Sequence, residues 1–218
     1  SNNPDYLYRL GGTQAAYSEV VSKFKVLSLI NTAKRNLIKS ASLDLNHIYS
    51  RWALVQILTE LPQILGGDKE DALKYCDEIL NISYIHGLLS YYYFYNFQKD
   101  EGLILDTEFK IFTEIQSNPV LFEFNHFNFI VGKLLINTDT SQFNLALRYL
   151  NRYLLNYSSA DRFSLEEVYY YLAYCNFYLG NNNSITLLKK SREIASKSQK
   201  KNYNLISKIE ELNKLMNQ

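Results

Sequence analysis

The sequence predicts an all-α protein, and three of its features lead to that prediction. Glycine and proline are scarce, with 8 and 3 copies in 218 residues, so the chain lacks the many tight turns that a β-sandwich or barrel needs. Apolar residues recur at helical spacing, as in Leu73, Cys76 and Ile79. Residues that favour helix starts and ends divide this pattern into short segments.

The expected helices follow one another with connections of only a few residues. A helix-rich entry covers about residues 5–40. The later helices are expected near 44–65, 68–81, 83–98, 100–117, 119–136, 140–156, 164–179, 182–197 and 200–217. Because the connections are short, consecutive helices are expected to be antiparallel neighbours.

Several of these helices have recognisable start signals. Ser164 and Glu167 have the spacing of a capping box, in which the serine hydroxyl accepts from the Glu167 amide and the glutamate side chain reaches back. The dipeptide Asn118-Pro119 fits an N-cap followed by a first helical residue that needs no N–H donor. Asp44 and Asp68 can each cap a helix start, where an acidic group also suits the positive end of the helix dipole.

Other residues mark weaker starts and helix ends. A less complete capping pattern begins at Asp139. Gly66-Gly67 and Gly180 fit the left-handed residue that closes a helix. Pro62 lies inside the expected helix 44–65, which predicts a kink or an early end there.

The helices form pairs that repeat along the chain. Second helices of successive pairs are expected to begin near residues 68, 100, 140 and 182, a spacing of roughly 32 to 42 residues. The clearest unit covers residues 169–194 and has a large aromatic residue, a leucine followed by a small residue, a Leu-Gly turn and a small residue in its second helix. These positions are Tyr169, Leu172, Ala173, Leu179, Gly180 and Ser184.

This unit resembles the tetratricopeptide repeat (TPR), and weaker units extend the resemblance over about three quarters of the chain. The resemblance implies antiparallel helix pairs stacked as a right-handed TPR-like superhelix, an α-solenoid. We therefore expect residues 1–45 to be a helical N-terminal cap or divergent repeat, residues 46–199 to be TPR-like helix pairs, and residues 200–218 to be a C-terminal capping helix. In this superfamily the first helix of each pair usually lines a concave groove.

The aromatic content, 19 Tyr and 12 Phe, suits such a groove. If Tyr169 and Leu172 point inward, Tyr170 and its neighbours one turn on face the concave side. Tyrosine gives a large contact area at little entropic cost, and an asparagine amide can pair with both N–H and C=O of an extended peptide. The expected peptide-binding residues are Tyr92, Tyr95, Asn96, Asn128, Tyr170, Tyr174 and Phe177. The alternative is that these tyrosines only pack between units.

No motif in the sequence indicates catalysis, a metal or a cofactor. There is no HExxH, no GxSxG, no phosphate-binding glycine loop and no CxxC pair. His47, His86 and His126 are isolated and are expected at helix surfaces or interfaces. Cys76 and Cys175 lie in apolar helical patterns and are expected to be buried free thiols. We expect a protein that is not an enzyme, with no cofactor.

The formal charge of +1 is unevenly distributed. Residues 185–218 contain eight Lys and Arg against three acids, a net charge of +5, so the first 184 residues carry about −4. Direct nucleic-acid binding is not expected from a nearly neutral chain. The basic C-terminal end is expected to be a solvated outer face, with a patch for an acidic partner or phosphate as the alternative.

The sequence favours a non-catalytic protein-protein interaction module that binds a peptide or protein segment in a concave, aromatic-rich groove. No membrane span and a cytoplasmic location are expected. The chain begins at Ser1, which leaves open an upstream DNA-binding or export segment. One alternative is the ligand-sensing domain of a bacterial peptide-pheromone-responsive transcriptional regulator without its DNA-binding segment. A second is a small-ligand-binding helical repeat protein, and a homodimer also stays open.

Overall fold

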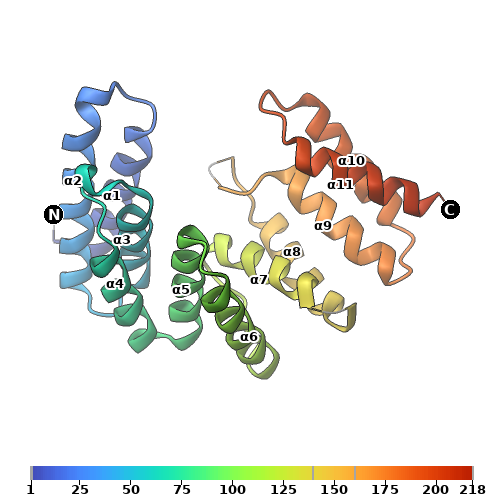
Figure 1. Cartoon of the computed structure of the whole chain (residues 1–218), viewed down its shortest axis with the longest axis horizontal. Helices are drawn as coiled ribbons and strands as arrows, with labels where there is room; N and C mark the ends of the chain where they lie inside the picture. Colours follow the sequence, from blue (N-terminus) through green and yellow to red (C-terminus); the bar gives the residue numbers. More distant parts are fainter. Residues whose placement is uncertain (1, 139, 160, 218) are drawn as a thin grey trace. The chain divides into compact units, whose positions relative to one another are not determined.

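A computed structural model describes residues 2–138, 140–159 and 161–217 of the chain. Within these ranges all regular structure is helical, with eleven α-helices, two short 3₁₀ turns and no strand (Figure 1). The expectation of an all-α protein is therefore confirmed. The chain divides into two compact units, residues 1–118 (unit 1) and residues 119–218 (unit 2). The boundary lies inside the range 46–199 that the sequence assigns to helix pairs.

Unit 1 contains six α-helices and one 3₁₀ turn. They are α1 (Pro4–Ser18), α2 (Lys23–Leu43), α3 (Ile48–Glu60), the 3₁₀ turn Gln63–Leu65, α4 (Lys69–Ile82), α5 (Tyr84–Gln98) and α6 (Glu101–Ser117). Each α-helix packs against the next one along the chain, and α3 also contacts both α1 and α5. The order of the helices can be followed from blue to green in Figure 1.

Unit 2 contains five α-helices and one 3₁₀ turn. They are α7 (Asn125–Thr138), the 3₁₀ turn Thr140–Gln142, α8 (Phe143–Leu155), α9 (Leu165–Tyr178), α10 (Ser184–Lys197) and α11 (Tyr203–Met216). Sequential helices again contact one another, and α9 also contacts α7 and α11. In both units the principal contacts between next-but-one helices join odd-numbered helices. This alternation is compatible with a helical repeat made of helix pairs.

Several helix boundaries are where local sequence signals predicted them. Asp68 caps α4, because its Oδ1 accepts hydrogen bonds from the amides of Glu70 and Asp71, both at 3.0 Å. Gly66 and Gly180 have φ angles of 89° and 72°, in the left-handed region that glycine adopts without strain. Helix α3 ends at Glu60, two residues before Pro62, so proline produces an early end rather than a kink.

Two predicted caps are different in the structure. Asp44 does not begin a helix but follows the end of α2, and α3 begins four residues later with the His47 imidazole accepting from the Ser50 amide at 3.1 Å. Ser164 precedes α9 as predicted, but its side chain makes no capping bond. The capping box is therefore not formed, and Glu167 instead lies 3.7 Å from the Lys133 ammonium.

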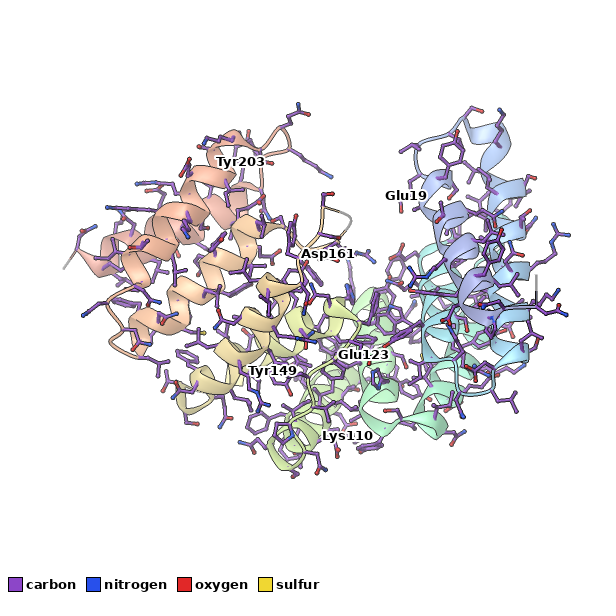
Figure 2. All side chains as sticks on the ribbon, turned by 180° about the vertical axis from the view of Figure 1, so that it is seen from behind. Glu19, Lys110, Glu123, Tyr149, Asp161 and Tyr203 are labelled. Atoms are coloured by element: carbon purple, nitrogen blue, oxygen red, sulfur yellow. The ribbon has the colours of Figure 1, made fainter. Side chains whose placement is uncertain are left out.

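The largest difference concerns the helix expected at 119–136. Helix α7 begins only at Asn125, and the preceding residues 119–124 are not helical. Tyr149 lies in the interior of unit 2 (Figure 2), and its hydroxyl donates to the carbonyl of Val120 at 2.8 Å. The backbone of residues 119–124 therefore forms hydrogen bonds with side chains in place of helical hydrogen bonds. The weaker start expected at Asp139 lies outside the described residues.

A buried arginine of α3 forms hydrogen bonds with neighbouring segments of unit 1. Arg51 is almost fully buried, and its Nε donates to Glu78 of α4 at 2.8 Å. Its two terminal nitrogens donate to the carbonyls of Ala41, Asp44 and His47 at 3.1 to 3.3 Å. These carbonyls belong to the last turn of α2 and to the loop that follows, where the helical hydrogen bonds of α2 end. One guanidinium therefore ties α2, α3 and α4 together.

Candidate functional site

The seven predicted binding residues lie in both units. Tyr92, Tyr95 and Asn96 lie on α5 of unit 1, and the other four lie on α7 and α9 of unit 2. The structure therefore gives two separate groups of side chains, which are described here one at a time.

On α5, three consecutive tyrosines point to three different helices. The hydroxyl of Tyr91 donates to Asp77 of α4, and that of Tyr93 donates to Glu60 of α3. Tyr92 faces Glu108 of α6, and burial together with this carboxylate raises the pKa of the Tyr92 hydroxyl to about 12. Successive helical residues are about 100° apart, which explains the three directions. Tyr92 is thus used for contact between helices.

The other two predicted residues of α5 are more open to solvent. The Tyr95 ring stacks on the ring of Tyr91, with centroids 5.6 Å apart and planes at 22°. Asn96 is exposed, and its Nδ2 donates to the backbone oxygen of Tyr92 at 2.7 Å. The amide oxygen of Asn96 and one edge of Tyr95 therefore offer only a small contact area.

Asn128 lies in the interior of unit 2, with no exposed surface. Its Oδ1 accepts from the Phe122 amide at 3.0 Å, and its Nδ2 donates to the Phe122 carbonyl at 2.9 Å. This is the two-point pairing expected for a bound peptide, but the paired backbone belongs to the chain itself. Asn128 does not line an exposed groove, because residues 119–124 turn back over it instead of extending α7.

On α9 Tyr170 is more buried than Tyr169, although Tyr170 was expected to face an open groove. Tyr170 is only 7% exposed, whereas Tyr169 is half-buried, with the Lys190 ammonium 5.4 Å above its ring. Helix α9 contacts helices on several sides, so Tyr170 has neighbours as well as Tyr169. Burial raises the pKa of the Tyr170 hydroxyl to about 12.

The structure does bring Tyr170, Tyr174 and Phe177 together in a group of rings. The ring centroids of Tyr170 and Tyr174 are 6.2 Å apart, and Tyr174 lies 4.7 Å from Tyr178. Phe177 lies 5.2 Å from Tyr178. Sequence reasoning missed Tyr178, although its place one turn after Tyr174 on the same helix face could have revealed it.

A buried phenylalanine of α8 packs against two of these rings. Phe143 is 2% exposed and lies 5.8 Å from Tyr174 and 6.0 Å from Tyr178. Tyr174 and Phe177 are half-buried, and Tyr178 is 46% exposed. We call Phe143, Tyr174, Phe177 and Tyr178 the α9 aromatic patch. It is a ring surface with a buried base and an open outer edge.

The charged groups at the first turn of α9 compensate one another. Lys133 of α7 lies 3.7 Å from Glu167 and 5.7 Å from the centroid of the Tyr171 ring. Burial raises the pKa of the Glu167 carboxyl, and the Lys133 ammonium opposes that rise. These charges lie about two turns or more before the patch along α9, and the patch itself presents ring faces that suit a ligand with apolar surface.

One arrangement in unit 1 has the residue types of a catalytic relay. Asp5 Oδ1 lies 3.3 Å from His47 Nε2, and His47 Nδ1 lies 3.0 Å from Ser50 Oγ. However, Ser50 has no exposed surface and donates its hydroxyl to the His47 carbonyl at 3.1 Å. A substrate cannot reach this hydroxyl, so the group explains a helix start and not a reaction.

The other two histidines are partly buried, and both cysteines are fully buried. Burial lowers the pKa values of His86 and His126 to about 4 and raises those of the Cys76 and Cys175 thiols to about 12. Both cysteines are free. Within the described ranges no three His, Cys, Asp or Glu side chains are arranged to hold a metal ion.

Unit 1 also has a pocket of about 340 Å³ between the end of α3 and the start of α4. Thr59, Gln63, Asp68, Lys69 and Glu70 supply its polar groups. Thr59 is 3% exposed, and its hydroxyl makes no hydrogen bond within the described part of the chain. A buried hydroxyl without a partner is costly, and such groups in proteins call for an explanation.

Comparison with known proteins places the chain in no family. None of the described helices is long and apolar enough to cross a membrane. The chain matches no protein-family model and no curated protein sequence.

Proposed function

We propose that the chain is a non-catalytic interaction module whose helix pairs stack in the right-handed manner of TPR-like repeats within each unit. Its ligand is a peptide or protein segment that binds across the first helices of the pairs. The contacts of α3 with α1 and α5, and of α9 with α7 and α11, support this view. They make the odd-numbered helices neighbours, as the first helices of stacked pairs are.

The α9 aromatic patch is the observation on which the binding role rests. Three of its four rings lie on α9, an odd-numbered helix, and Tyr178 keeps almost half of its surface exposed although three other rings surround it. Contiguous exposed apolar surface on a protein commonly marks an interaction site. An apolar side chain of the ligand would bury these ring faces, and a few aromatic anchors would supply most of the affinity.

A peptide array of random sequences tests the proposal. We expect Phe177→Ala together with Tyr178→Ala to weaken binding of the selected peptides about tenfold or more, because truncating aromatic anchors costs over 1 kcal/mol each. Tyr203→Ala, at an exposed tyrosine of α11 outside the patch, is the matched control. Tyr170 is not used, because its buried ring also supports the fold. Unchanged binding by the double variant would exclude the patch.

The pocket of unit 1 favours a second candidate function, the binding of a small polar ligand. Its volume of about 340 Å³ is at the lower end of ligand pockets, and the Thr59 hydroxyl lacks a partner. A thermal-shift screen against metals, nucleotides and lipids would test this candidate. A ligand that stabilises the protein, but not its Thr59→Val variant, would support it.

A further inference from the structure

The last two helices of unit 2 form a narrow cleft that is separate from the α9 aromatic patch. Its floor is apolar, with Leu188 of α10 and Ile209 of α11 almost fully buried. The cleft has a volume of about 30 Å³. Its full lining is Ile185, Leu188, Lys189, Arg192, Ile209, Asn213, Met216 and Asn217, which we call the C-terminal cleft.

The size of the cleft limits what can enter it. The small volume of about 30 Å³ leaves room for the tip of one side chain, and the apolar floor favours an aliphatic one. Ile185 forms one wall and is half exposed, so part of its surface is free for contact. An aliphatic tip placed there would cover both Ile185 and the floor.

The rim of the cleft is basic, and one of its cations is free. Arg192 Nε donates to Glu210 at 3.1 Å, so its charge is largely balanced. The Lys189 ammonium has no hydrogen bond or ion pair within the described residues, and it lies one helical turn from Ile185. A carboxylate bound beside the cleft would therefore meet an unpaired positive charge next to an apolar wall.

Most other cations of this end are already engaged. Lys197 pairs with Glu193 at 2.6 Å, Lys201 donates to the Ala195 carbonyl at 3.1 Å, and Lys190 lies over the Tyr169 ring. A phosphate backbone or an anionic membrane needs many free cations on one surface. At the rim of the cleft itself Lys189 is the unpaired cation among the described residues, and one lysine beside an aliphatic floor suits a short acidic peptide.

We propose that the C-terminal cleft binds an acidic segment of a partner protein through one aliphatic side chain and an adjacent carboxylate. The aliphatic tip fills the space above Leu188 and Ile209, and the carboxylate pairs with Lys189. The net charge of +5 over residues 185–218 speeds the approach of an acidic partner and excludes basic ones. The partner is bound by chemistry different from that of the neutral α9 patch.

Fluorescence anisotropy with labelled repeat peptides tests this inference. A Glu-Glu-Leu repeat peptide should bind the wild-type chain, whereas a Glu-Glu-Ser repeat and a Lys-Lys-Leu repeat of equal length should bind far less. Lys189→Glu should lower the affinity at least about tenfold, because it places like charges in contact. Ile185→Asp should do the same. Both positions are exposed, and thermal melting of each variant confirms that it folds.

Lys200→Glu is the matched control, since it makes the same charge change on the connection between α10 and α11, outside the cleft. We expect it to change the affinity by less than about twofold. An equal loss in this control would mean diffuse attraction and would overturn the proposal. Equal binding of the Glu-Glu-Ser repeat would do so as well. Preferred binding of phosphatidylserine vesicles or duplex DNA would indicate a phosphate surface instead, and dimerisation abolished by Lys189→Glu would indicate a second copy.

Discussion

The two units use aromatic residues in different ways. In unit 1 the tyrosines of α5 direct their hydroxyls to carboxylates on neighbouring helices, as Tyr91 and Tyr93 do. In unit 2 aromatic rings mainly contact other rings, and the rings of Phe129 and Phe163 stack with centroids 4.0 Å apart. Aromatic residues therefore stabilise the units either through a tyrosine hydroxyl or through a ring face. The neighbouring segment decides which, by offering a polar acceptor or another ring.

The difference extends to the most buried groups. At the centre of unit 1 lies Arg51, a charged group whose donors bond to one carboxylate and three carbonyls. The corresponding core of unit 2 is dominated by Phe129, Tyr153 and their ring neighbours. Unit 1 is therefore expected to be sensitive to loss of polar groups, and unit 2 to loss of ring volume.

Phe129→Ala should have the largest effect and should act on unit 2. The ring is fully buried against Tyr153, Phe163 and Tyr171, so its removal leaves a cavity and should cost about 4 kcal/mol. Hydrogen exchange read by mass spectrometry should show faster exchange of the amides of α7 to α9. The exchange rates of α1 to α4 should not change. Equal loss of protection in both units would remove the contrast between them.

Arg51→Ala should destabilise unit 1 instead, through the loss of polar contacts rather than of ring volume. It leaves the Ala41 carbonyl without its guanidinium donor and Glu78 without its partner, so a loss of about 3 kcal/mol is expected. The single tryptophan, Trp52, follows Arg51 in α3 and reports this unfolding by its fluorescence in a urea titration. A variant as stable as the wild type would show that the network contributes nothing net.

Acid should destabilise unit 2 through protonation of His126. Its pKa is lowered from 6.5 to about 4, because the ring is buried against Phe124 and Phe163 and the Arg162 charge opposes protonation. The folded state thus binds fewer protons than the unfolded state between these values. Stability is complete above about pH 6.5 and falls, by up to about 3 kcal/mol, as the pH decreases to 4.

Urea titrations at several pH values measure this loss, and His126→Phe should flatten the profile. His86 in unit 1 has its pKa lowered in the same direction by burial. In this respect the two units are alike, so some acid sensitivity should persist in the variant. An unchanged profile in His126→Phe would show that other groups cause the acid loss.

Asn128→Ala should have a moderate effect. It removes both hydrogen bonds to the Phe122 backbone, and about 2 kcal/mol should be lost because these buried groups find no new partner. The amides of residues 120–124 should exchange faster, while those of α10 and α11 should not change. Protection that persists at 120–124 would mean that burial of the Phe122 ring alone holds the segment.

A pair of hydroxyl deletions gives the smallest and most selective test. Tyr93→Phe removes the bond to Glu60 and should cost about 1 kcal/mol. Tyr170→Phe keeps a ring whose contacts are with Tyr171 and Tyr174, and it should cost less than about 0.5 kcal/mol. Thermal melting of the two variants compares them directly. Equal costs would mean that hydroxyls matter alike in both units.

Local sequence signals predicted the helices well, because each signal acts within one turn of the chain. Asp68 caps α4 and Gly180 closes α9 with no help from distant residues. The candidate site was harder to predict. Spacing correctly grouped Tyr170, Tyr174 and Phe177 on one side of α9, but it could not show that Tyr170 is buried or that Asn128 faces the chain's own backbone.

Helical periodicity and capping are local properties, and they were enough to predict a protein built of helices joined by short connections. Which polar groups are used internally follows instead from how the helices pack. Asn118-Pro119 carries a valid start signal, yet the bonds that Asn128 and Tyr149 offer to residues 120 and 122 favour a non-helical backbone there. Partners that are distant along the chain compete with local preference, and their positions follow from packing rather than from residue spacing.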